Sequence, residues 1–182
     1  MDPRYKKIQW LVLGFSMLIM FVFLIGFLLP QKFEVSREIE VETSANKIFP
    51  LINEIRKWPD WTVWNVMHDP TLRLTFEGPE EGVGAKELWY SEKMGDGSIE
   101  LTYSSLNSAV NYTMITQEGR FEIYGSLTLS PTTTGTSVVW KSRGNLPFNP
   151  VSRYFGLFMR YLLGPDMDYG LAKLKQKAEA NS

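Results

Sequence analysis

The residues best suited to chemistry gather in KWPDWTVWNVMHDP, residues 57–70, which holds three of the six tryptophans and the single histidine. Trp58, Trp61 and Trp64 recur at every third position, and His68 follows them. A histidine can act as a general base or a metal ligand, whereas tryptophans line apolar sites or pack in a core. The segment is therefore a reactive centre, a pocket wall or a packing motif.

A metal centre or a nucleophilic triad has little support in the sequence. The chain has no cysteine, which excludes disulfides and thiol chemistry, and one histidine cannot form a His-x-x-x-His pair. No Gly-x-Ser-x-Gly elbow is present, and GVGAKE at 82–87 lacks the third glycine of a dinucleotide-binding loop. We therefore expect no metal, no cofactor and no catalytic residue, and we interpret His68 as part of a loop.

Acid–base chemistry by carboxylates stays open as an alternative. Glu87, Glu100 and Glu122 fall on predicted strands. A glutamate that pointed into an apolar cavity would have a raised pKa and could act as an acid or a base. The default expectation for all three is a position on the outer, solvated face of an antiparallel sheet.

An apolar segment at residues 8–29 is the strongest single feature of the chain. It is 22 residues long, and its only polar members are Gln9 and Ser16. As a helix it would measure ~33 Å, enough to cross a bilayer core of ~30 Å. The alternatives are a buried core helix and a cleavable signal peptide, but the run exceeds a usual signal h-region and Leu28–Gln31 is no small-x-small cleavage site. We predict an uncleaved transmembrane anchor over residues 1–31.

The charges that flank this segment predict its orientation. Three basic residues precede it at Arg4, Lys6 and Lys7, while two follow it at Lys32 and Arg37. The positive-inside rule places the N-terminus in the cytoplasm and residues 32–182 on the periplasmic or extracytoplasmic side. The whole chain has a net charge of −1 with no basic patch, so no nucleic-acid partner is expected.

The remainder reads as one α+β domain. Alternation of apolar and polar residues at 32–42 predicts a strand, helical spacing follows from Ser44, and Pro59 ends that helical section. Six further strands are predicted at 71–76, 86–92, 98–106, 110–116, 120–130 and 137–142. A helical pattern at 149–163 is interrupted by Gly-Pro-Asp at 164–166 and restarts at 167–180. Short connections predict a seven-stranded antiparallel sheet, and only the C-terminal helix is long enough to cover it.

The order of motifs resembles a known superfamily. The matching stretches are EVSREIEVETSANKIFPLIN (34–53), RKWPDWTVW (56–64), GVGAKELWYS (82–91), FEIYGSLTLSPTTTGTSVVWKSRG (121–144) and LLGPDMDYGLAKLK (162–175). In this order they resemble the helix-grip fold of the START/Bet v 1-like (SRPBCC) superfamily. More narrowly, they are similar to bacterial polyketide cyclase/dehydrase and lipid transport proteins, in a membrane-anchored form. The resemblance implies a sheet wrapped around the C-terminal helix, with a cavity between them for an apolar or amphipathic ligand.

Aromatic residues are the best candidates for the cavity wall. The resemblance and the strand pattern together give the set Trp61, Trp64, Trp89, Tyr112, Phe121, Tyr124, Trp140, Phe155 and Phe158. Tyr112 and Tyr124 could each offer a hydroxyl to a ligand head group. Trp58 precedes the break at Pro59 and the other two tryptophans of residues 57–70 follow it, so the three need not share one helical face, and Trp58 is expected to pack in the core.

Three functions follow from these observations. The first is binding or transport of a lipid or another hydrophobic small molecule by a membrane-anchored domain. The second is a cyclase, dehydratase or hydrolase, which requires an ionisable residue in the cavity. The third is a structural or stress-related interaction protein, in which side chains fill the cavity and leave less than ~300 Å³. The sequence identifies no protein partner.

Overall fold

The computed structural model describes residues 3–93, 95–116 and 121–180. Seven strands form one antiparallel sheet in the order β1-β7-β6-β5-β4-β3-β2. The strands are β1 (Lys32–Val41), β2 (Arg73–Glu77), β3 (Lys86–Tyr90), β4 (Gly97–Ser105), β5 (Ala109–Thr116), β6 (Phe121–Pro131) and β7 (Thr136–Asn145). Consecutive strands pair from β2 to β7, and β1 closes the order by pairing with β7 from Lys32↔Asn145 to Val41↔Thr136. The predicted meander and the α+β class are confirmed.

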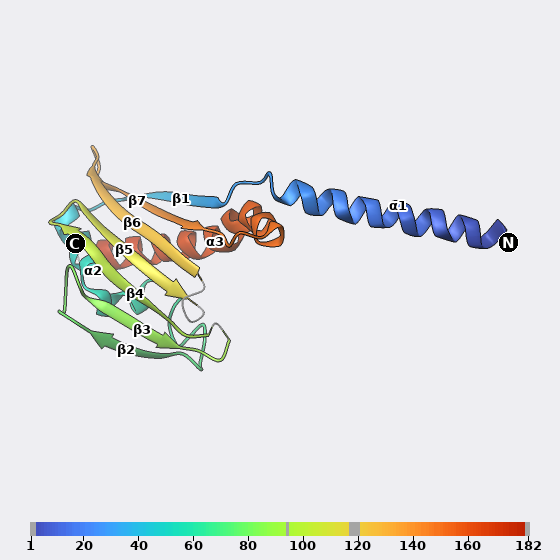
Figure 1. Cartoon of the computed structure of the whole chain (residues 1–182). Helices are drawn as coiled ribbons and strands as arrows, with labels where there is room; N and C mark the ends of the chain where they lie inside the picture. Colours follow the sequence, from blue (N-terminus) through green and yellow to red (C-terminus); the bar gives the residue numbers. More distant parts are fainter. Residues whose placement is uncertain (1–2, 94, 117–120, 181–182) are drawn as a thin grey trace.

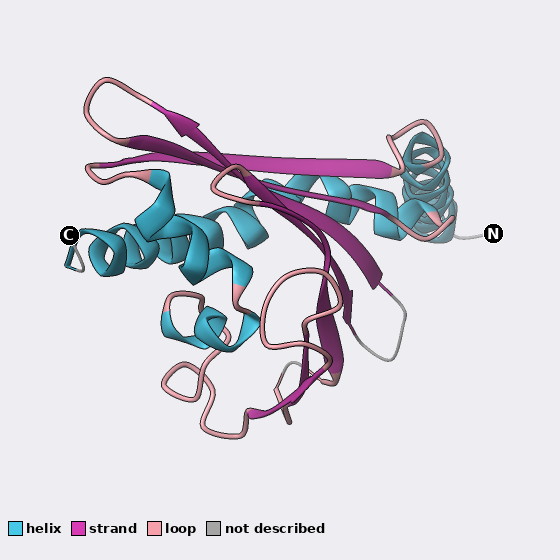
Figure 2. Cartoon of the chain, turned by 90° about the vertical axis from the view of Figure 1, so that its left-hand side faces the viewer, coloured by secondary structure: helices cyan, strands magenta, loops and turns pink. Residues whose placement is uncertain are grey.

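The curved sheet has one face packed on helices and one exposed. In β7, Val138, Trp140 and Ser142 are buried, while Lys141 and Arg143 between and beyond them are exposed. This period of two is the one that buries alternate side chains of a strand. Figure 2 shows the helix α3 (Pro150–Ala180) lying along the concave side of the sheet, as the helix-grip fold requires.

Two short helical segments pack beside α3. They are α2 (Ala45–Asn53) and the 3₁₀ helix η1 (Ile55–Asp60). Ile48, Ile52 and Ile55 are fully buried under the sheet, as their helical spacing predicts. The C-terminal half of α3 completes this core with Leu171 and Leu174.

The predicted interruption of the C-terminal helix is wrong. Helix α3 is continuous over 31 residues, with Pro165 in its interior. An interior proline costs about 3 kcal/mol because it removes one backbone hydrogen bond and crowds the preceding turn. Burial of Met167 and Leu171 on the sheet, and an ion pair of 2.9 Å from Arg37 of β1 to Asp168, favour continuation of the helix past Pro165.

The apolar N-terminal segment forms a single helix, α1 (Pro3–Gly26). It projects away from the domain as a rod, and its junction with the domain lies beside the start of α3 (Figure 1). Residues Lys7–Gly26 are long and apolar enough to cross a membrane, and residues 7–24 of this helix are exposed. The helix therefore contributes almost nothing to the core of the domain.

Candidate functional site

A cavity of about 770 Å³ separates the first half of α3 from strands β5 and β6. Its wall is mainly apolar and includes five polar side chains, and the cavity is partly open to the outside. The apolar residues are Phe33, Trp64, Met114, Phe121, Ile123, Leu146, Phe155, Met159, Leu162 and Leu163, and the polar ones are Thr116, Glu122, Asn145, Ser152 and Asp166. An apolar wall with few polar points is typical of sites for small hydrophobic ligands.

A smaller cavity continues the large one toward the core. Its volume is about 20 Å³, and it shares five wall residues with the large cavity, including Trp64, Met114 and Asp166. That volume suffices for a single water molecule. Tyr112 and Ser142 line this inner end, so two hydroxyl-bearing side chains stand in an otherwise mainly apolar wall.

A hydrogen-bond network fixes the polar side chains at the inner end. The indole nitrogen of Trp140 donates to the Tyr112 hydroxyl at 2.8 Å, and that hydroxyl lies 3.1 Å from the hydroxyl of Ser142. Burial raises the pKa of Tyr112, so the phenol stays neutral and keeps its proton for hydrogen bonding. The ring packs against Gly125 of β6, where an added Cβ would come within 1.9 Å of it.

The three tryptophans of residues 57–70 have different positions. Trp58 and Trp61 are buried with 5.2 Å between ring centroids, and their indole nitrogens donate to the Ile52 and Leu51 carbonyls, each at 3.0 Å. Trp64 instead lines both cavities. Packing accounts for Trp58 as expected, whereas Trp61 differs from the expected wall residue because its indole is enclosed by Trp58 and Trp140.

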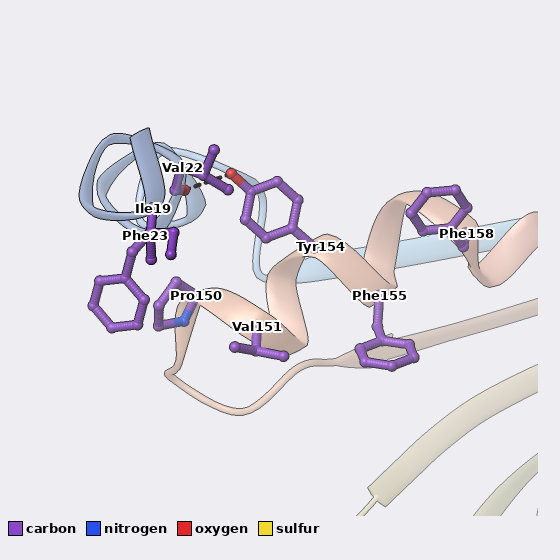
Figure 3. Close-up of a pocket in the computed structure, with 8 residues that line it drawn as sticks. All are labelled: Ile19, Val22, Phe23, Pro150, Val151, Tyr154, Phe155 and Phe158. Carbon is purple, nitrogen blue, oxygen red and sulfur yellow. Dashed lines mark hydrogen bonds between the residues drawn. The ribbon is translucent and has the colours of Figure 1, made fainter. Parts of the chain in front are cut away.

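The other candidate aromatics also divide. Phe121 and Phe155 line the large cavity, and Tyr112 and Trp140 line its inner end. Phe158 lies in a separate apolar groove of about 330 Å³ between α1 and α3, which Phe155 also lines (Figure 3). Trp89 is buried in the core at β3 and lies on none of these walls.

Tyr124 requires a correction. It is exposed on the outer face of β6, where its neighbours include Lys141 and Arg143, so its hydroxyl cannot reach the cavity. The reason is the period of two along β6, because Phe121 and Ile123 face the cavity and Tyr124 must then face away. A hydrogen bond with Glu122 raises the pKa of Tyr124.

Asp166 is a wall residue that the sequence analysis missed. It lines both cavities from α3. Partial burial raises the pKa of its carboxyl, and the charge of nearby His68 opposes that rise. Its position three residues after Leu163 places it on the cavity face of the helix, so an unbroken α3 would have indicated it.

The three glutamates occupy different environments. Glu87 is buried, contrary to the default expectation of an outer-face position, and its Oε2 has no hydrogen-bond partner in the described part of the chain. Burial raises the pKa of Glu87 to about 8. Glu100 pairs with Lys86 at 3.7 Å, and Glu122 is exposed at the cavity rim. Glu87 lines neither cavity.

Residues 3–93, 95–116 and 121–180 contain no group of three or more histidine, cysteine, aspartate or glutamate side chains that could hold a metal ion. His68 is exposed and packs edge-on against Tyr169, with 5.0 Å between ring centroids. The Asn65 side-chain oxygen lies 3.1 Å from its ring nitrogen Nδ1. These contacts are those of a loop residue.

Comparisons with known proteins agree with this architecture. The family described as "Polyketide cyclase / dehydrase and lipid transport" matches residues 32–179. The sequence matches no curated protein. Similarity to solved structures is confined to the fold, because the sequence identities are low.

Three solved structures illustrate that similarity. The di-domain ARO/CYC protein StfQ of the steffimycin biosynthetic pathway has a TM-score of 0.63 at 14% identity over 83% of this chain, which spans only 52% of StfQ. Protein SA2116 of Staphylococcus aureus, of unknown function, has a TM-score of 0.63 at 12% identity, over 82% of this chain and 95% of its own. A Thalictrum norcoclaurine synthase mutant bound to a transition-state analogue has a TM-score of 0.59 at 15% identity, over 83% of this chain and 97% of its own.

Proposed function

This chain belongs to the polyketide cyclase/dehydrase and lipid transport family, and on that premise we propose that it binds or carries a lipid or another hydrophobic small molecule between α3 and the sheet. The observation that carries the proposal is the cavity of about 770 Å³, which lies within the ~300–1,000 Å³ range of small-molecule sites. This volume argues against the alternative in which side chains fill the interior. Trp64, Phe121 and Phe155 would contact the apolar part of the ligand.

Two polar positions would orient such a ligand. The Tyr112 and Ser142 hydroxyls stand at the inner end, and Asp166 stands on the wall where the two cavities meet. A head group that donates hydrogen bonds fits Asp166, and a hydroxyl or carbonyl fits the inner end. An apolar chain would then occupy the wider outer part between Met114 and Met159.

We also propose that residues 1–31 form a transmembrane anchor for the binding domain of residues 32–182. Support comes from the length and composition of α1 and from the exposure of its residues 7–24. The basic residues at its N-terminal side favour a cytoplasmic N-terminus and a periplasmic domain in a bacterium. Fusion of alkaline phosphatase or a fluorescent protein to the C-terminus tests this orientation, because the former is active only outside the cytoplasm and the latter favours the cytoplasm.

A blocked cavity tests the ligand proposal. In the full chain, purified in detergent and stripped of lipid, Ile123→Trp would place an indole in the cavity that Ile123 lines. Ile115→Trp is the matched control, since Ile115 is exposed on the neighbouring strand. We expect a fluorescent phospholipid or fatty acid probe to bind the wild type and Ile115→Trp, but not Ile123→Trp. Equal binding of the probe to all three proteins would contradict the proposal. So would a wild type that carries no ligand by native mass spectrometry and binds none of the probes.

An enzyme of the cyclase or dehydratase type is the second candidate. Asp166 favours it, because a carboxyl with a raised pKa on a cavity wall can take part in proton transfer. Ligands recovered from the purified protein provide the test. Conversion of such a ligand by the wild type and not by Asp166→Asn would support catalysis, and unchanged ligand in both would leave binding as the function.

A further inference from the structure

We propose that the first half of α3, residues 150–163, lies in the surface of the bilayer beside α1, so that the cavity opens toward lipid rather than toward water. The inference rests on the proposed anchor and deepens it by naming the surface that meets the membrane. Five observations on the described residues carry it: the contact between α1 and α3, its depth, the exposed side chains that follow it, the charge of that surface, and the junction of the groove beside α1 with the cavity.

Specific contacts hold the start of α3 against the end of α1. The Tyr154 hydroxyl donates to the Val22 carbonyl at 2.6 Å, and Figure 3 shows the Tyr154 ring pointing toward α1. The guanidinium of Arg153, itself 7% exposed, donates to the carbonyls of Phe27 and Leu29. Both carbonyls belong to the connection that follows α1 after Gly26. The first turns of α3 therefore stay fixed to the end of α1.

The position of this contact sets its depth. Val22 lies four residues before the end of α1 at Gly26, which is ~6 Å along the helix axis. Helices that lie in a membrane surface bury their apolar face by ~5–10 Å. If α1 spans the bilayer, Tyr154 is held at the depth where such helices lie.

The surface that continues from this contact is apolar. Exposed large side chains cover the first half of α3, namely Val151, Phe155, Leu157, Phe158, Tyr161 and Leu162, and each is about half exposed or more. Leu157 and Tyr161 follow Tyr154 by three and seven residues, so they extend the face that touches α1. Exposed apolar patches of this kind are rare on soluble domains and mark contact surfaces.

The charge of this surface also fits phospholipid. The sequence has no aspartate or glutamate from residue 123 to residue 165, and the charged side chains of 150–163 are Arg153 and Arg160. Tyrosines and arginines beside apolar residues are typical of membrane interfaces. Acidic residues return at Asp166 and Asp168, beyond the apolar surface.

The groove beside α1 and the large cavity meet at Phe155. The groove between the helices, lined by Ile19, Val22 and Phe23 of α1, shares Phe155 with the large cavity. A lipid chain that lies against α1 would reach the cavity by passing one aromatic ring. Phe155 is therefore the wall between the bilayer and the ligand site.

The absence of native cysteine allows a direct test with single labels on the full chain. Leu157→Cys reports on the proposed surface, because Leu157 lines neither the groove beside α1 nor the large cavity. Gln176→Cys is the control at an exposed position of the same helix. Each variant, labelled with bimane, is reconstituted into phosphatidylcholine–phosphatidylglycerol vesicles. We expect quenching by lipids that carry a nitroxide near the head group to be several-fold stronger at position 157 than at 176. Equal quenching at the two positions would overturn the inference.

Probe binding separates this inference from the proposed function. Strong quenching at position 157, in a protein that does not bind a fluorescent phospholipid, would support the membrane contact and refute the proposed ligand binding. Equal quenching with a bound phospholipid would refute the contact and leave the ligand site standing.

The route past Phe155 has its own test in the rate of probe uptake from vesicles. Phe155→Ala should accelerate uptake several-fold, while Tyr161→Ala, on the same surface but on neither wall, should leave the rate unchanged. An unchanged rate in Phe155→Ala would rule out this entry route.

Discussion

Replacement of the buried Glu87 by glutamine should change how the stability of the domain depends on pH. Glu87 is 2% exposed on β3 and its Oε2 has no partner in the described part of the chain. Burial raises its pKa from 4.5 to about 8. In the folded protein the carboxyl is therefore mostly protonated at pH 7, whereas in the unfolded chain it is ionised.

The sign and size of the effect follow from this difference. Folding takes up a proton between the two pKa values, so the stability contribution is fully present below pH 4.5 and is lost as the pH rises through about 8. Each pKa unit corresponds to ~1.36 kcal/mol, so the wild type should lose about 3 kcal/mol between pH 4.5 and pH 7 from this group alone. Glu87→Gln keeps the shape and has no proton to take up, so this loss should disappear and the variant should be the more stable protein at pH 8.

Urea unfolding of the full chain in lipid nanodiscs provides the measurement. Five of the six tryptophans lie outside α1, so their fluorescence reports on the domain. The free energy of unfolding is compared from pH 5 to pH 8 at constant salt, with unchanged denaturant slopes as the criterion for two-state unfolding. Glu100→Gln is the matched control, because Glu100 is partly exposed and paired with Lys86. A wild type with flat stability over this range, or a Glu87→Gln variant whose stability falls with pH as steeply as that of the wild type, would refute the reasoning.

Three further predictions concern the cavity and the core. Gly125→Ala should destabilise the domain by about 1–3 kcal/mol and weaken probe binding, because the added methyl overlaps the Tyr112 ring; unchanged urea midpoints and probe affinity would contradict this. Trp61→Ala should cost ~3–5 kcal/mol as a core truncation, whereas Trp64→Ala should mainly reduce probe affinity, and calorimetry with probe titration separates the two outcomes. The hydroxyls of Ser91 and Thr71 donate to Asp69 and lower its pKa. The stability that Asp69 contributes is therefore present at neutral pH and lost as the pH falls through the lowered pKa. Asp69→Asn should make acid unfolding below pH 4 less steep, and an unchanged acid transition would exclude this role.

The sequence predicts the sheet well because each strand carries its own alternating pattern. The alternation shows which residues of a strand share a face. It does not show which face points inward until the position of one residue of that strand is known. Tyr124 shows the consequence. Tyr112 and Tyr124 both looked suitable for the cavity, and only Tyr112 lies on the inward face of its strand. Arg37 shows the reverse, because a cation on an inward position of β1 is explained by its contacts with α3, an ion pair with Asp168 and a hydrogen bond to the Arg160 carbonyl.

Helix α3 departs from the expectation for a similar reason. Gly-Pro at 164–165 is a local signal for a break, and long-range packing overrides it. The missed wall residue Asp166 follows directly from that error, since an interrupted helix gives it no defined face. The sequence could not predict the burial of Glu87 either, because the alternating pattern of β3 does not say which of its two faces is the inner one.

The connection between α1 and β1 limits how a bound ligand can be moved. Only residues 27–31 separate the two elements, a span of at most ~18 Å even when fully extended. Arg153 holds two of the carbonyls in that connection, which shortens its reach further. Under the proposed function, such a domain cannot ferry cargo across a gap between two membranes. The domain would experience the lipid concentration of its own bilayer at all times, so a weak affinity for lipid is enough to keep its cavity occupied. Delivery would require a second protein that approaches the domain and accepts the bound molecule.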